Sequence, residues 1–178
     1  MTFITREHLV INSPKFEEIE KDIRKSYPKA CVLWIEDIRN PKLEKKYKMQ
    51  KEEIQNKRGF CNELELYHGS SEQAISFIIS DGFRTSKNKT SAYGKGTYFA
   101  KKANYSKDYA KDSGDKISFM MICSVLVGEC NIYSSNQTIN TTKHDNSVNS
   151  INNPTIVVTP YDYGAIPRYI IAMHKNAQ

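Results

Sequence analysis

The spacing of hydrophobic and polar positions predicts a helix, a strand and a second helix in the first third of the chain. Helical spacing of apolar residues begins after Ser13, a good N-cap, and Pro14, which suits the first helical position, and it ends near Tyr27. Residues 31–38 are rich in strand formers, and residues 41–54 return to helical spacing.

A second strand and helix follow. Leu64 and Leu66 alternate with polar residues, which predicts a strand that places His68 at its end. Apolar residues recur at helical spacing over 74–79, and Gly82 is expected to close this helix because glycine adopts the backbone conformation that ends helices.

The second half of the chain is predicted to consist mostly of strands and loops. Residues 117–127 are apolar on both faces, as expected of a strand at the centre of a sheet that is covered on both sides. Asn, Ser and Thr dominate residues 129–153, which predicts a long surface loop. The remaining elements expected are a polar loop at 83–97, a short strand ending at 98–100, a short helix at 103–111 and strands at 155–159 and 169–173.

Composition predicts one globular domain over residues 1–178. Apolar residues make up 39% and charged residues 26% of the chain, which excludes collagen-like and disordered classes. The run 119–127 is too short to span a membrane, and residues 1–6 lack the features of a secretory signal, so we expect an intracellular protein, cytoplasmic or nuclear, with no membrane partner. The cysteines lack zinc-ligand spacing, so we expect no metal site, no disulfide framework and free buried thiols.

Positive charge is concentrated in one stretch. The net charge is +6, and residues 84–116 contain nine basic and three acidic residues, whereas the rest of the chain is balanced. A basic stretch is usually a solvated face, but it also attracts anions such as a pyrophosphate or an acidic protein surface. A basic nucleic-acid-binding domain is therefore one alternative, although the sequence contains no recognised nucleic-acid-binding motif.

Three short segments combine aromatic rings, small residues and a histidine at expected strand ends. They are Tyr67-His68-Gly69-Ser70, the segment YGKGTYFA at 93–100 and Ala103-Asn104-Tyr105-Ser106. Each is a weak signal alone, because a lone histidine is usually structural and Gly-Lys-Gly lacks the remaining spacing of a phosphate-binding loop.

Together and in this order, the three segments resemble the catalytic domain of poly(ADP-ribose) polymerase-like, diphtheria-toxin-like ADP-ribosyltransferases. The family pattern is an H-G-S/T strand, a G-x-G-x-Y-F-A strand and an A-x-Y-S helix, and the resemblance extends to residues 38–47, 153–158 and 166–171. It implies an α+β ADP-ribosyltransferase fold, with a mixed, mostly antiparallel split β-sheet core and flanking helices. We expect no regulatory helical subdomain of the kind that some members carry, because the sequence is short.

The resemblance implies that NAD+ is the co-substrate and that no metal takes part. Gly69 has no side chain to obstruct its backbone groups, so with Ser106 it is expected to clamp the nicotinamide carboxamide. Tyr98 and Tyr105 are expected to stack on the nicotinamide, and His68 to bond ribose hydroxyls. The full set implied to bind the co-substrate is His68, Gly69, Ser70 on the adenosine side, Tyr98, Phe99, Ala100, Tyr105 and Ser106.

Ile156 is the departure from the polymerising members, which carry a glutamate at that position. An isoleucine side chain accepts no hydrogen bond and takes no proton, so it cannot activate the ribose hydroxyl on which a chain would grow. His68, Tyr98 and Ile156 are therefore the expected catalytic residues of a mono-ADP-ribosyltransferase. The expected acceptors are protein side chains, chiefly Glu and Asp, with self-modification left open.

One further alternative keeps the fold without the reaction: a catalytically silent module that binds NAD, ADP-ribose or a partner protein. Retention of His68, Tyr98, Tyr105 and Ser106 argues against it, because a pure binding module has no chemical need for all four residues. We expect a monomer, with at most weak binding of nucleic acid.

Overall fold

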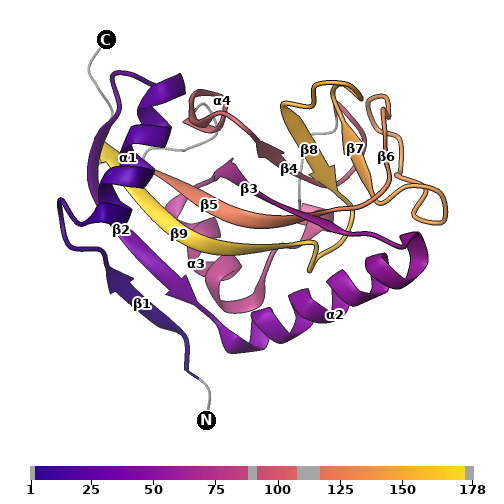
Figure 1. Ribbon diagram of the computed structural model, residues 1–178, viewed down its shortest axis with the longest axis horizontal. Coiled ribbons are helices and arrows are strands. Elements are labelled where there is room, and N and C mark those ends of the chain that lie inside the picture. The colour runs from indigo at the N-terminus through magenta and orange to yellow at the C-terminus, as the bar shows by residue number, and fades with distance from the viewer. Residues whose placement is uncertain (1–2, 88–91, 108–116, 175–178) are drawn as a thin grey trace.

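The computed structural model describes residues 3–87, 92–107 and 117–174, and its elements are shown in Figure 1. In chain order they are β1 (Thr5–His8), α1 (Pro14–Ser26), β2 (Cys31–Arg39), α2 (Pro41–Arg58), β3 (Asn62–Gly69), α3 (Glu72–Asp81), a 3-10 turn (Thr85–Lys87), β4 (Thr97–Ala100), α4 (Ala103–Lys107), β5 (Ile117–Val127), β6 (Cys130–Asn131), β7 (Asn146–Val148), β8 (Ile156–Thr159) and β9 (Ala165–His174).

The described strands form one mixed sheet in the order β1-β2-β9-β5-β3-β4-β8-β7-β6. All neighbours are antiparallel except β6 and β7. The joint between β3 and β4 rests on a single residue pair, Tyr67 opposite Ala100, whereas β3 pairs with β5 along its whole length. The sheet is thus continuous but narrows at this joint into two halves, in agreement with the expected split, mostly antiparallel core.

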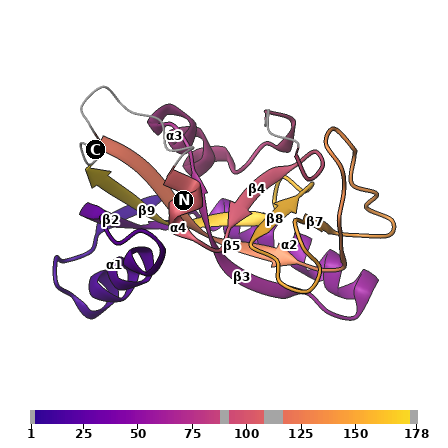
Figure 2. The ribbon, with the colours of Figure 1, turned by 90° about the horizontal axis from the view of Figure 1, so that it is seen from above.

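Helices cover both faces of the sheet (Figure 2). Phe16, Ile19 and Ile23 of α1 pack with Met120 and Ile122 of β5 on one face. On the opposite face, α3 packs with residues of β3, β5 and β9 through Ile75, Ile78 and Ile79. Helix α2 lies on the same face as α1, towards the far end of β5 and β9 (Figure 2). The central strand β5 is therefore covered on both faces, as its apolar sequence predicts.

Most predicted elements are confirmed, including the first helix, which Ser13 caps and which ends at Ser26 with Tyr27 as its C-cap. The side chain of Asn40 caps α2, and Gly82 caps the end of α3. The predicted helix at 103–111 begins where expected, but residues 108–111 lie outside the described residues. No helix in the described part of the chain is long and apolar enough to cross a membrane.

The prediction of a surface loop over residues 129–153 holds for most of the segment but was wrong for two parts of it. This segment contains β6 and β7, and residues 145–148 are fully buried. The polar composition suggested a loop, but the polar groups of the buried side chains are satisfied by hydrogen bonds to other segments. The Asn146 side chain donates to the Leu126 carbonyl and accepts from the Gly128 amide. Polar residues can form an inner strand when their hydrogen bonds are satisfied in this way.

Two further details differ from expectation at the strands. Strand β1 was not predicted, and β9 begins at Ala165 rather than at residue 169, so that it includes Pro167. Proline is disfavoured inside a sheet because it cannot donate to the ladder. Here Ile122 of β5 pairs with Tyr169 and Cys123 pairs with Pro167, so Arg168 is an extra residue of β9 with no opposite residue on β5. Pro167 therefore lies next to a bulge-like irregularity of the strand.

The cysteines are free thiols, as predicted, but only Cys123 is buried. Cys31 is exposed, and Cys61 and Cys130 are partly buried. Among the described residues, no group of three or more histidine, cysteine, aspartate or glutamate side chains is arranged to hold a metal ion.

Candidate active site

The candidate site lies at the narrow joint between β3 and β4. Backbone pairing of these strands is limited to Tyr67 and Ala100, and the next residue of β3 is His68. The Nδ1 atom of His68 donates to the carbonyl oxygen of Tyr98 at 2.8 Å. A side-chain hydrogen bond therefore links the two strands where the backbone ladder stops.

The environment of His68 fixes its protonation state. A carbonyl oxygen only accepts hydrogen bonds, so Nδ1 must carry the proton. Burial lowers the pKa of His68 below its ordinary value of 6.5, against the opposing effect of the bond to the Tyr98 carbonyl. The ring is therefore neutral near pH 7, and Nε2 is left with a lone pair that can accept a hydrogen bond from a hydroxyl group.

Two phenylalanine rings hold the imidazole of His68 in place. The His68 ring lies 5.2 Å from Phe83 and 5.4 Å from Phe99 between centroids, and these two rings meet edge to face at 5.2 Å. Both phenylalanines are buried. The resemblance placed Phe99 among the co-substrate contacts, but its side chain is buried in the core, so only its backbone is available to a ligand. Sequence analysis missed Phe83, which was assigned to an irregular loop.

The hydroxyl of Tyr98 organises the glycine-bearing segment that precedes β4. It donates to the Gly94 carbonyl at 2.7 Å and accepts from the Tyr93 amide at 2.8 Å. Gly94 has a φ of 89°, which other residues rarely adopt, and a Cβ on Gly96 would lie 2.5 Å from the Thr159 carbonyl oxygen. The two glycines of the motif are thus needed for local conformation and for close packing against β8.

Ile156 lies beside Tyr98 at the start of β8. It pairs with Ala100 across the strands, is 3% exposed and shares an apolar cluster with Ala100, Val158 and the partly buried Tyr98. The side chain of Asn149 accepts from the Ile156 amide at 3.0 Å and so anchors the beginning of the strand. Asn149 was not recognised from sequence because it lies in the segment that was predicted to be a loop.

Helix α4 brings the third motif to the same joint. It follows β4 after a two-residue turn and packs on β3, β4 and β5. Ser106 is 3% exposed, whereas Tyr105 is 41% exposed. Gly69 and Ser70 are partly buried at the end of β3. All three motifs predicted from sequence therefore come together near the β3–β4 joint. Of the basic stretch at 84–116, Lys89, Lys111 and Lys116 lie outside the described residues.

Comparisons with known proteins identify the family. A family model described as the poly(ADP-ribose) polymerase catalytic domain matches residues 13–159. The protein mono-ADP-ribosyltransferase PARP14 of Homo sapiens is 30% identical over 94% of this chain, and PARP12 of Mus musculus is also 30% identical over 94%. PARP10 of Mus musculus, named likewise a mono-ADP-ribosyltransferase, is 27% identical over 93%.

The chain spans only a small part of these relatives: 10% of the length of PARP14, 25% of PARP12 and 19% of PARP10. The likeness is therefore one of domains. Because the family model covers most of the chain, and because the three motifs meet at the β3–β4 joint, the chain belongs to the poly(ADP-ribose) polymerase catalytic domain family.

Proposed function

We propose that this chain is a single catalytic domain that transfers one ADP-ribose unit from NAD+ to a carboxylate side chain of a protein and releases nicotinamide. The observation that carries the proposal is the arrangement of His68, Tyr98 and Ile156: a neutral imidazole, a pinned tyrosine and an aliphatic residue meet at the β3–β4 joint. The names of the relatives support transfer of single units.

In this proposal NAD+ is held by residues on both sides of the joint. The lone pair on Nε2 of His68 accepts a hydrogen bond from a ribose hydroxyl, and the backbone of Gly69 and the hydroxyl of Ser106 bond the carboxamide of nicotinamide. The rings of Tyr98 and Tyr105 stack on the nicotinamide. Ser70 lies towards the adenosine, and the backbone of Phe99 and Ala100 forms part of the wall of the NAD+ site.

The reaction needs no proton transfer when the acceptor is ionised. A carboxylate oxygen attacks C1′ of the nicotinamide ribose and forms a C–O bond. The bond from C1′ to the ring nitrogen breaks, and its electron pair neutralises the pyridinium as nicotinamide leaves. The product is a glycosyl ester. Holding both reactants in line supplies much of the rate enhancement, and the acceptor's own negative charge stabilises the developing ribosyl cation.

Growth of a chain would require a different group at position 156. A ribose hydroxyl is a weak nucleophile and needs a base or hydrogen-bond acceptor, which the isoleucine side chain does not provide. The acceptor specificity and the single transfer are therefore two consequences of the same apolar side chain.

Nicotinamide release from NAD+ tests the proposal, with and without a glutamate-rich acceptor protein. Wild type should release nicotinamide, and His68→Ala should lower the rate at least about a hundredfold because ribose orientation is lost. His144→Ala is a matched control: His144 is also partly buried and its Nδ1 also contacts a tyrosine, the Tyr133 hydroxyl, at 2.9 Å. If wild type binds NAD+ but releases no nicotinamide, the chain is instead a binding module.

A further inference from the structure

A hollow of about 440 Å³ lies between the C-terminal end of α1 and the turn that joins β4 to α4. The two helices lie side by side in Figures 1 and 2, and the Asn104 amide contacts the Ser26 hydroxyl at 3.4 Å. The residues that line the hollow are Asp22, Lys25, Ser26, Lys101, Lys102 and Asn104.

The charge of this hollow is not balanced. Lys101 and Lys102 are exposed, and among the described residues neither is paired with a carboxylate. The one carboxylate in the lining, Asp22, already accepts from Lys25 at 3.0 Å and from the Tyr67 hydroxyl at 2.5 Å. Two ammonium groups are thus left to attract an anion.

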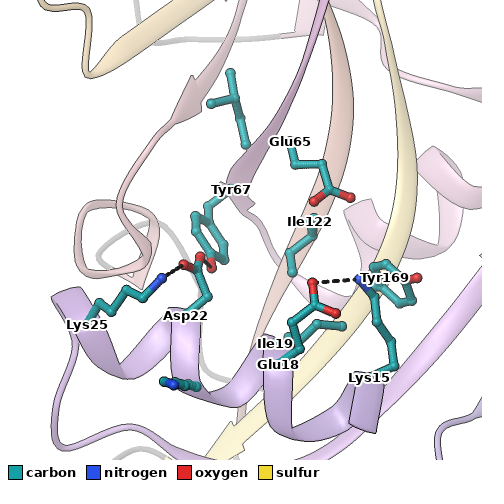
Figure 3. A pocket seen from close by; sticks show the side chains of 11 residues that line it. Lys15, Glu18, Ile19, Asp22, Lys25, Glu65, Tyr67, Ile122 and Tyr169 are labelled. Carbon is teal, nitrogen blue, oxygen red and sulfur yellow. Dashed lines mark hydrogen bonds and ion pairs between the residues drawn. The ribbon is translucent and has the colours of Figure 1, made fainter.

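A neighbouring cleft along α1, which shares Asp22 and Lys25 with the hollow, shows the contrast. This cleft of about 370 Å³, drawn in Figure 3, lies between α1 and strands β3, β5 and β9. It contains three lysines and three acidic residues, and Lys15 pairs with Glu18 at 3.0 Å while Lys25 pairs with Asp22. Its charges are compensated, so positive charge is concentrated at Lys101 and Lys102 rather than spread along α1.

The lysine pair follows directly on the proposed catalytic strands. The Lys101 amide donates to the Thr155 carbonyl at 2.9 Å. The next residue pair along the two strands is Ala100 with Ile156. The Lys101 backbone therefore lies one residue pair away from Ile156, at the end of β4 that leads into α4.

We propose that Lys101 and Lys102, beside the ion pair of Lys25 and Asp22, form a docking surface for an acidic segment of the acceptor protein. The inference rests on the proposed function, because it assigns to this surface the delivery of a carboxylate to the Ile156 side of the site. One carboxylate held by the lysines anchors the segment while a neighbouring one reaches the ribose. Long-range attraction by the pair also raises the rate of encounter with acidic targets.

The shape of the surface favours an acidic peptide over nucleic acid. A nucleic-acid backbone needs a stripe of positive charge several phosphates long, usually with arginines or with aromatic rings for stacking. The hollow has neither arginine nor aromatic residues in its lining, and the adjoining cleft along α1 is electrically balanced. Ser26 and Asn104 instead offer the neutral hydrogen-bonding groups that suit a peptide backbone.

Binding of a fluorescent glutamate-rich peptide to the full chain, measured without NAD+, tests the proposal separately from turnover. Lys101→Glu/Lys102→Glu should weaken binding about tenfold, because two attractions become repulsions. Lys45→Glu/Lys48→Glu is the matched control: both residues are exposed on α2, away from α4 in Figure 1, and the change in net charge is the same. The control should bind the peptide within about twofold of wild type.

Three outcomes would overturn the docking surface. They are equal weakening in both double variants, which indicates diffuse charge attraction; no detectable binding of the peptide to wild type; and tighter binding of a single-stranded oligonucleotide through Lys101 and Lys102, which indicates a nucleic-acid surface. Failure of the proposed function has a different signature, since wild type would then release no nicotinamide whatever the peptide binding shows.

Discussion

The Nδ1 atom of His68 donates to the backbone carbonyl of Tyr98 at 2.8 Å, and this bond lies one residue beyond the single backbone pair that joins β3 to β4. It fixes the neutral tautomer of the imidazole and ties the first two motifs of the site together. The candidate site thus lies at the joint with the fewest residue pairs in the described sheet, where β3 and β4 part.

The lowered pKa of His68 predicts how the reaction depends on pH. Burial favours the neutral ring, so kcat/KM for NAD+ should be level above about pH 6.5. It should fall as the pH drops below the lowered pKa, because a protonated Nε2 no longer accepts from a ribose hydroxyl. The sign for stability is the same: the unfolded state takes up the proton first, so stability also declines below about pH 6.5. A rate that rises with acidity would contradict the assigned tautomer.

Phe83→Leu should impair NAD+ binding more than it impairs folding. The substitution removes the ring edge 5.2 Å from His68, so the imidazole gains freedom and the KM for NAD+ should rise about fivefold with a smaller change in kcat. Phe16→Leu is the control, because Phe16 is equally buried but packs on the opposite face of the sheet. Equal KM values for the two variants, at matched thermal stability, would show that Phe83 only fills the core.

Ile156→Glu should not produce a polymerase. The side chain is 3% exposed among apolar neighbours, so burial would raise the pKa of a new carboxyl group and keep it protonated. We expect a less stable protein and products that still carry single ADP-ribose units, as judged by gel mobility and mass. Ile156→Val serves as the control for packing, at a cost of about 1 kcal/mol. Long products from Ile156→Glu would contradict the account.

Asp145→Asn should lower the free energy of unfolding by about 3 kcal/mol at pH 7, measured by urea denaturation. Asp145 is fully buried and accepts from Arg58 at 2.8 Å, from Lys57 and from the Tyr161 hydroxyl at 3.0 Å. An amide cannot replace these charged bonds. The network joins the end of α2 to the segment that the sequence presents as a loop.

The pH dependence of this difference gives a second readout. Burial alone would raise the pKa of Asp145, but the bonds from Arg58 and Lys57 outweigh burial and lower the pKa. The stabilisation is therefore complete above the ordinary value of 3.8 and is lost as the pH falls through the lowered pKa. The gap between wild type and Asp145→Asn should narrow below about pH 4. A gap that is constant between pH 7 and pH 3 would argue against an ionised Asp145.

Local sequence patterns were sufficient to predict the helices and strands that depend mainly on neighbouring residues. The caps Ser13 and Gly82 and the apolar run of β5 identified their elements because each acts through neighbouring residues. The same holds for the three motifs, which the sequence placed at strand ends. Their meeting at one joint is a consequence of strand order, which no local pattern contains.

The features that the sequence could not predict depend on contacts with residues outside the local pattern. Asn146 and Asn149 resemble loop residues until the structure supplies their partners on β5 and β8. Phe83 resembles a loop residue until its ring is seen against His68. In each case the deciding contact is made with a residue outside the local pattern, from seven positions away for Asn149 to twenty for Asn146.

The most direct test of the central claim is to measure the intact mass of the chain after incubation with NAD+. The product is then digested with a phosphodiesterase, and His68→Ala is treated in the same way as the control. The account predicts nicotinamide release, increments of single ADP-ribose units on the chain or on an added acidic acceptor, and AMP as the only nucleotide fragment that digestion frees. Phosphoribosyl-AMP in the digest would reveal ribose-to-ribose linkages, and undiminished increments on His68→Ala would show that the β3–β4 joint is not the active site. Either result would contradict the account.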